Sequence, residues 1–295
     1  MRRRITRTLL AAAAAGVTVS TLGFTAAGAA NATVTGTAAR TVIAPMPIAN
    51  TYAAGYELSG RNFRFIAATL TVPDWTSSLL FPSEFIQLSN GSLPEHLNPG
   101  SDQYVRAGIE PCVVARTFGA ICTTGDWVSF VEAFNNSLSG PYFSHFSDLS
   151  GVVAGDGVFF SVYFDQGGNE LHFVITPPST SGPSQSYKTN AHGPIFNYAA
   201  ALDDFTNSTG VPIPVPPFLD QYRINQFLGG AVTTYSGARG SFVGPWLTSM
   251  VEATSNGLPF PSGHVRVSPS RLWSDGLISN GPARPWDAFG VWART

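Results

Sequence analysis

The sequence predicts an all-β protein built as an antiparallel β-sandwich. Its apolar residues fall in short runs rich in aromatic and β-branched side chains, the residues that strands favour. Turn formers separate these runs at short intervals, with 30 Gly and 22 Pro in the chain. Helical periodicity is almost absent, and the roughly 240 residues after the N-terminal region suit one all-β domain.

The strands that we expect follow one another along most of the chain. The turn sequence Asp165-Gln166-Gly167-Gly168-Asn169 separates two of them and is typical of a hairpin connection. One short helix is expected over 196–205, inside a proline-containing surface excursion over 177–217. The expected strands are 62–72, 84–88, 103–110, 127–134, 157–164, 170–176, 221–227, 246–254, 264–268 and 289–293.

The N-terminal 32 residues read as a cleaved signal peptide. Three consecutive arginines begin the chain, an Ala-rich apolar stretch follows, and Ala27-Gly28-Ala29 and Ala30-Asn31-Ala32 fit small-residue cleavage sites. The stretch is too short and too weakly hydrophobic for a membrane-spanning helix. We therefore expect a secreted, extracellular protein with a linker or short propeptide over 33–55 and one sandwich domain over 56–295.

The charge of the chain excludes some classes of partner. Of its 16 basic residues four lie in the signal region, so the exported part is acidic, and Lys188 is the only lysine. A basic surface for phosphates or anionic lipids is therefore not expected, which argues against nucleic acid and membrane partners. We expect a monomer that binds a polypeptide or a polysaccharide.

Cys112 and Cys122 are the only cysteines. Because they lie ten residues apart in a chain with an export signal, they most simply form one disulfide that closes a short loop. A metal site would need more ligands, and no histidine lies near them in the sequence. No metal and no cofactor are expected, since the sequence also lacks a serine-hydrolase elbow, a phosphate-binding loop and a dinucleotide fingerprint.

Two glutamates within apolar strand-like runs are the clearest sign of chemistry. Glu132 lies within 127–134 and shares a strand face with Val128, Phe130 and Phe134, and Glu252 lies within 246–254. Burying an unpaired carboxylate is costly, so such a residue usually has a partner, a shifted pKa or a place in a functional cleft. A buried structural charge network is the alternative interpretation.

Five segments in the same order resemble the strands of glutamic peptidases, the eqolisins. They are 63–73 (FRFIAATLTVP), 104–109 (YVRAGI), 127–134 (WVSFVEAF), 153–157 (VAGDG) and 248–253 (TSMVEA). Together they span nearly the whole domain. The resemblance implies a concanavalin-A-like double β-sandwich, a jelly roll whose catalytic glutamate activates water and whose glutamine stabilises an oxyanion.

Carried onto this chain, the resemblance implies Glu252 as the catalytic glutamate and Glu132 as the second glutamate. Arg106 occupies the position of the glutamine, and a guanidinium beside Glu252 would lower the pKa of that carboxyl and weaken it as a base. Arginine can also donate to an oxyanion, so Arg106 is a candidate for the electrostatic role. The resemblance also implies a substrate-binding role for Phe85, which falls near the position of the family's active-site tryptophan. Glu110, on the strand face of Arg106, and Phe130, on the strand face of Glu132, are the other substrate-binding candidates.

Three functions follow from these residues. The first is hydrolysis of peptide bonds at acidic pH by a glutamate-activated water. The second is an inactive peptide- or carbohydrate-binding module of the same fold. The third is a two-carboxylate glycosidase, because sandwiches of this class also carry paired carboxylates. The peptidase requires that Arg106, Glu132 and Glu252 converge in one hollow of the folded sandwich.

Overall fold

A computed structural model of the chain describes residues 48–74, 81–91, 103–123, 126–138, 140–149, 151–179, 182–193, 195–206, 214, 225–255, 265–272 and 288–293. All of them belong to one compact unit that spans Ile43–Thr295. The expected signal peptide lies outside the described residues. No described helix is long and apolar enough to cross a membrane.

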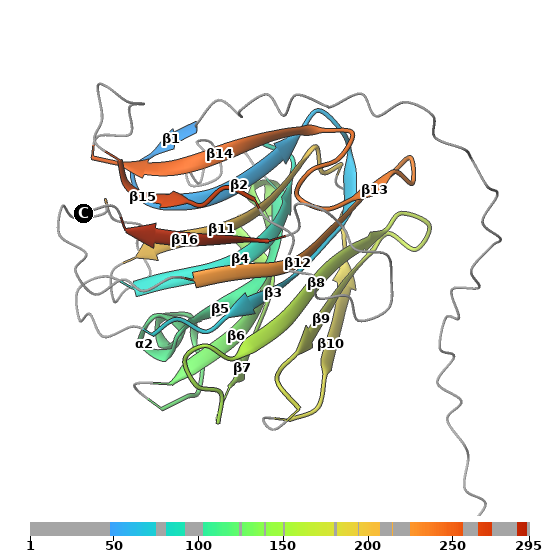
Figure 1. Cartoon of the computed structure of the whole chain (residues 1–295). Coiled ribbons are helices and arrows are strands. Elements are labelled where there is room, and N and C mark those ends of the chain that lie inside the picture. Colours follow the sequence, from blue (N-terminus) through green and yellow to red (C-terminus); the bar gives the residue numbers. More distant parts are fainter. Residues whose placement is uncertain are drawn as a thin grey trace, which may run out of the picture. The chain divides into compact units, whose positions relative to one another are not determined.

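The described strands form an antiparallel β-sandwich, as the sequence predicts. They follow one hydrogen-bonded path that folds back on itself, so that β3 and β8 lie over β4 and β5 (Figure 1). Layer I, in spatial order, contains β14 (Leu247–Thr254), β2 (Ala53–Ser59), β11 (Tyr198–Thr206), β4 (Phe81–Ser89), β5 (Gln103–Pro111), β6 (Trp127–Asn135) and β7 (Gly140–Asp148).

Layer II faces layer I across the main core. It contains β10 (Gln185–Asn190), β9 (Glu170–Thr176), β8 (Gly157–Asp165), β3 (Phe63–Thr71), β12 (Asn225–Thr234) and β16 (Phe289–Ala293). β15 (Val265–Pro269) pairs with both β16 and β14 and so joins the two layers. β1 (Ile48–Asn50) pairs parallel with β14, and β13 (Arg239–Gly240) pairs with β12. The short helices α2 (Cys112–Ala115), η1 (Arg116–Phe118) and η2 (Asn136–Leu138) occupy connections in layer I.

The main core lies between the layers because strand side chains alternate between two faces. In β4, Ile86 and Leu88 point into this core, whereas Phe85 belongs to a second, smaller cluster on the opposite face. Aromatic contacts join the layers: the rings of Phe143 in β7 and Phe173 in β9 stack with centroids 5.7 Å apart. We call the face of layer I that points away from the main core its outer face.

Several expected elements differ from those that the structure describes or lie partly outside the described residues. The helix expected over 196–205 is strand β11, which pairs on both sides, with β2 and β4. The surface excursion expected over 177–217 contains both β10 and β11. The strand expected over 221–227 overlaps only the start of β12, since 221–224 lie outside the described residues. β7 and β2 had no predicted strand, and β1 with the start of β2 falls within the range assigned to a linker, 33–55.

Candidate functional site

The outer face of layer I gathers polar side chains around Arg106. Along one row of cross-strand neighbours, Gln87 in β4 lies opposite Arg106 in β5, and Arg106 lies opposite Glu132 in β6. The adjacent row is apolar and includes Phe85 and Phe130, which belong to the small cluster of the outer face. Because opposite residues of an antiparallel pair share a face, the strand register alone brings these groups together.

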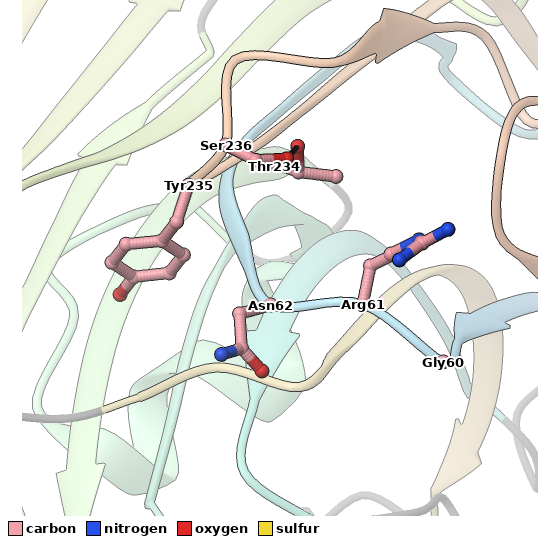
Figure 2. A pocket seen from close by; sticks show the side chains of 6 residues that line it. All are labelled: Gly60, Arg61, Asn62, Thr234, Tyr235 and Ser236. Atoms are coloured by element: carbon pink, nitrogen blue, oxygen red, sulfur yellow. Dashed lines mark hydrogen bonds between the residues drawn. The ribbon is translucent and has the colours of Figure 1, made fainter.

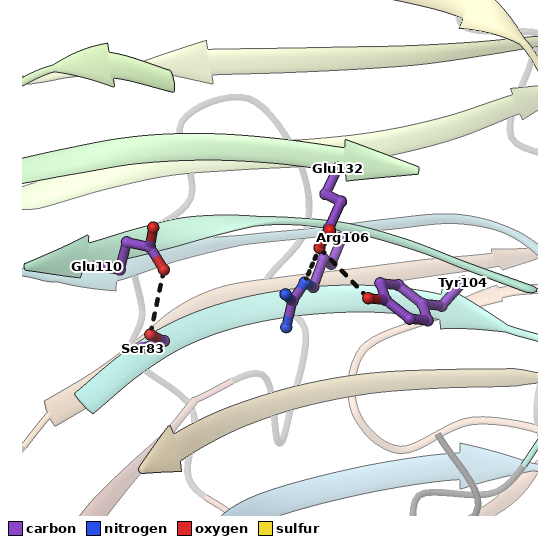
Figure 3. Close-up of polar contacts among 5 residues, drawn as sticks. All are labelled: Ser83, Tyr104, Arg106, Glu110 and Glu132. Atoms are coloured by element: carbon purple, nitrogen blue, oxygen red, sulfur yellow. Dashed lines mark hydrogen bonds and ion pairs between the residues drawn. The ribbon is translucent and has the colours of Figure 1, made fainter. Parts of the chain in front are cut away.

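Arg106 is held by one carboxylate and three aromatic rings. Its Nε donates to Glu132 Oε2 at 2.6 Å, and the side chains are 23% and 18% exposed (Figure 3). The guanidinium carbon lies over the rings of Phe85, Tyr104 and Phe130, at 5.3, 5.2 and 5.4 Å from their centroids. Such stacking fixes the plane of the guanidinium and favours its charged form.

The two terminal nitrogens of Arg106 make no hydrogen bond to another residue in the described part of the chain. Burial alone would lower the pKa of Arg106, but the negative charges of Glu132 and Asp204, together with the hydrogen bond to Glu132, raise it further than burial lowers it. The side chain therefore stays charged and presents fixed donors at the outer face.

Tyr104 completes the contact. Its hydroxyl donates to Glu132 Oε2 at 3.5 Å, a long hydrogen bond, and its ring stacks on Phe134 with centroids 4.9 Å apart. Burial is the main reason that the pKa of Tyr104 is raised. The tyrosine is thus neutral at all ordinary pH values and serves as a donor.

Two buried carboxyls lie on the same face, on either side of Ser83. Asp204 in β11 is opposite Ser83 in β4, and the Ser83 hydroxyl donates weakly to Glu110 Oε2 at 3.4 Å (Figure 3). Burial raises the pKa of Glu110 to about 8, although Arg106 opposes this. Burial likewise raises the pKa of Asp204 to about 6. Glu110 Oε1 and Asp204 Oδ1 are buried without a partner in the described structure.

Glu252 does not join this group. In β14, Met250 lies opposite Tyr56 and packs against the main core, and Glu252 is two residues further on the same face. The charge of Glu252 raises the pKa of Tyr56, after the larger effect of burial, and Tyr56 is a main-core residue. The expectation that Arg106, Glu132 and Glu252 converge is corrected: Arg106 and Glu132 meet, and Glu252 lies on the opposite face.

A second carboxyl pair lies on the main-core side of layer I. Asp203 in β11 is opposite Glu84 in β4, and both are fully buried. Burial, followed by the charge of Asp203, raises the pKa of Glu84 well above its usual value. A proton on Glu84 removes one of the two adjacent buried charges.

Cys112 and Cys122 form the expected disulfide, which closes the loop that contains α2 and η1. Because Cys112 directly follows β5 and Val128 of β6 packs beside it, the bridge fixes the connection between the two strands that carry Arg106 and Glu132. The disulfide is therefore structural support for the site.

A separate pocket of about 370 Å³ lies between the turn after β2 and the turn after β12 (Figure 2). There, Arg61 Nε donates to the carbonyl of Pro245 at 2.9 Å, and Tyr235 N donates to the carbonyl of Asn62 at 2.9 Å. Its residues come from turns and not from the outer face of layer I. The lining residues are Gly60, Arg61, Asn62, Thr234, Tyr235 and Ser236.

The strand alternation in the sequence predicts that Glu110 shares a face with Arg106, and Phe130 with Glu132. In the structure both pairs and the candidate Phe85 lie on the outer face of layer I. Asp204, Tyr104 and Ser83 also belong to the site but were not predicted. Asp204 lies in the segment 196–205, which was expected to be a helix. No sequence motif singles out Tyr104 or Ser83 as a site residue. The spacing of two residues does, however, place Tyr104 on the same strand face as Arg106.

Comparison with known proteins gives a fold and not a family assignment. No family model matches the chain, and no curated protein matches it. A crystal structure of scytalido-glutamic peptidase with a transition state analog inhibitor is 14% identical, with 83% of this chain and 100% of that one covered and a TM-score of 0.52. SCP-B, an eqolisin-family peptidase in complex with the tripeptide Ala-Ile-His, is 11% identical, and the comparison again covers 83% of this chain and 100% of that one, with a TM-score of 0.40. The first comparison shows that the chain shares the fold of glutamic peptidases.

Proposed function

We propose that the chain is an exported polypeptide-binding module whose ligand contacts Arg106 on the outer face of layer I. One observation carries the proposal: a guanidinium fixed by Glu132 and three rings has two terminal nitrogens without a partner among the described residues. Fixed, partly exposed donors bind acceptor oxygens without losing much conformational freedom.

A polypeptide is the preferred ligand for two reasons. Carbonyl groups along an extended chain are acceptors at regular spacing, and the Arg106 charge is already balanced by Glu132, so a neutral acceptor suits the site. One solved structure that shares the fold is that of a glutamic peptidase. Export is supported by the N-terminal pattern and by the disulfide, which persists in oxidising compartments.

The test is a binding titration with reduced, carboxymethylated lactalbumin as an unfolded polypeptide. The double variant Arg106→Met/Glu132→Gln removes the guanidinium without leaving Glu132 as an unpaired charge. Since a hydrogen bond from a charged donor contributes about 1.5–3 kcal/mol, the double variant should bind about 10- to 100-fold more weakly. Arg61→Met, at the turn after β2, is the matched control and should bind like the wild type.

Equal binding by the wild type and the double variant would exclude Arg106 as the contact. Binding of a soluble β-glucan in place of the unfolded polypeptide would make the chain a carbohydrate-binding module. Circular dichroism of each variant checks that the sandwich is intact.

Hydrolysis of the bound polypeptide is a second candidate function, and the pKa values of Glu110 and Asp204 favour it. Between about pH 6 and 8, Glu110 holds its proton and Asp204 is ionised. These are the states that a general acid and a general base need. Cleavage of the same substrate should then stop in Glu110→Gln and in Asp204→Asn, and persist in Glu252→Gln. If the wild type releases no cleavage product, polypeptide binding without hydrolysis remains the proposed function.

A further inference from the structure

Gln87 is a largely buried residue beside Arg106 on the outer face of layer I. It lies on β4, directly opposite Arg106, and is 4% exposed. Its side chain makes no hydrogen bond within the described part of the chain, whereas Gln185 in β10 accepts one from Tyr187 at 2.7 Å. Neither amide atom of Gln87 is among the fully buried side-chain atoms that lack a partner. The amide is therefore open to the outer face of layer I, where a ligand can reach it.

Two neighbours of Gln87 are apolar. On the same face, Ala200 lies opposite Gln87 from β11, and Ala200 and Phe85 belong to the apolar cluster of the outer face. These neighbours give the amide no hydrogen-bond partner, so its donors and its acceptor remain available to a ligand at the outer face.

Together, Gln87 and Arg106 offer the groups that complement a peptide bond. The amide supplies one acceptor oxygen and two donors, and the arginine supplies the donors of its terminal nitrogens. A peptide group needs an acceptor for its N–H and a donor for its C=O. The pair could satisfy both from one side of an extended chain.

We infer that Gln87 and Arg106 bind one main-chain peptide group of the ligand, with Gln87 Oε1 accepting the ligand N–H and Arg106 donating to the ligand C=O. This inference rests on the proposed function, namely that the ligand is a polypeptide. Because every residue except proline carries both main-chain groups, the site tolerates many ligand sequences and selects against proline at this position.

The first test is the near-isosteric variant Gln87→Met, titrated with carboxymethylated lactalbumin. We expect about tenfold weaker binding together with an unchanged thermal midpoint, because the Gln87 amide forms no hydrogen bond with the described residues that would stabilise the fold. A purely structural glutamine gives the opposite pair of results: a lower thermal midpoint and unchanged affinity. Gln226→Met, in β12 of layer II, is the matched control and should leave affinity unchanged.

The second test locates the main-chain contact. A decapeptide of lactalbumin that binds the wild type is compared with analogues in which one peptide bond at a time is replaced by an ester, which removes one N–H. One ester should weaken binding to the wild type about tenfold and have no effect on Gln87→Met.

The outcomes separate the two proposals. If Gln87→Met binds like the wild type while Arg106→Met/Glu132→Gln does not, the inference about Gln87 is overturned and the proposed function stands. If the wild type binds no polypeptide, the proposed function itself fails. If every ester analogue binds equally well, the ligand main chain does not contact Gln87.

Discussion

At the scale of single residues, the site depends on what surrounds Arg106 more than on the arginine itself. A lone guanidinium on a sheet would be mobile and hydrated. Here Glu132 holds one of its nitrogens, and Phe85, Tyr104 and Phe130 stack around it, so its remaining donors have a fixed direction. This preorganisation is what qualifies Arg106 as a binding residue.

Gly108 is the residue that lets Phe85 take its place in this arrangement. It lies opposite Phe85, and a Cβ at this position would collide with the Glu84 carbonyl oxygen and with Cα and Cβ of Phe85. Because the obstacle includes backbone, which cannot turn away, Gly108→Ala should lower the free energy of unfolding by about 1–3 kcal/mol. Urea unfolding measures this change.

The matched control for Gly108 is Gly167→Ala, in the turn between β8 and β9. A Cβ there meets only Asp165 Oδ1 at 3.5 Å, an ordinary contact. Its effect should stay within about 0.5 kcal/mol. Equal stability of Gly108→Ala and the wild type would show that Phe85 does not pack against Gly108.

At the scale of elements, β4, β5 and β11 carry four carboxyls at one end: Glu84 and Asp203 toward the main core, Glu110 and Asp204 on the outer face. All are buried, and the charged groups that act on Glu110 are Arg106, Glu132 and Asp204. Arg106 alone does not balance so many acids. These strands therefore fold most favourably with some of the carboxyls protonated.

The consequence is a stability that declines as the pH rises. Glu110 has a pKa of about 8 in the fold against 4.5 as the ordinary value, and Asp204 about 6 against 3.8. Because these pKa values are raised in the fold, the unfolded chain releases the two protons at a lower pH than the folded chain does. Their contribution to the free energy of unfolding is therefore complete below about pH 4 and is lost as the pH rises through about 8. Thermal midpoints measured from pH 4 to 9 should fall across this range.

Glu110→Gln is the variant that isolates this effect, because it removes the carboxyl that titrates last. Its thermal midpoint should fall less between pH 6 and 8 than that of the wild type. A wild-type midpoint that rises from pH 5 to 8 would mean that these carboxyls are ionised in the fold.

The type of a single element is also the feature that is hardest to predict from the sequence. Strands with alternating aromatic and β-branched residues, such as β6 and β9, were predicted within one residue of their ends. The segment 196–205, expected as a helix, forms most of β11, a central strand of layer I whose small side chains fit between β2 and β4. Tertiary packing decided its structure, and a local pattern does not contain that information.

At the scale of the whole molecule, the sandwich could be predicted because its strands and turns repeat throughout the chain. The face on which a residue lies could be predicted within one strand, as for Arg106, Glu110 and Glu132. Which strands become neighbours could not, because β14 reaches layer I through pairing with β2 and β15, far away in sequence. The misplacement of Glu252 follows from this: its face depends on a register that no sequence pattern fixes.

The most direct test of the central claim is to map where an unfolded polypeptide binds. Nuclear magnetic resonance spectra of the labelled domain are recorded while carboxymethylated lactalbumin is added. The account predicts that the shifted signals cluster at Gln87, Arg106 and Glu132, including the Arg106 side-chain Nε–H. Shifts that cluster instead at Arg61 and Ser236, or around Glu252, would contradict it.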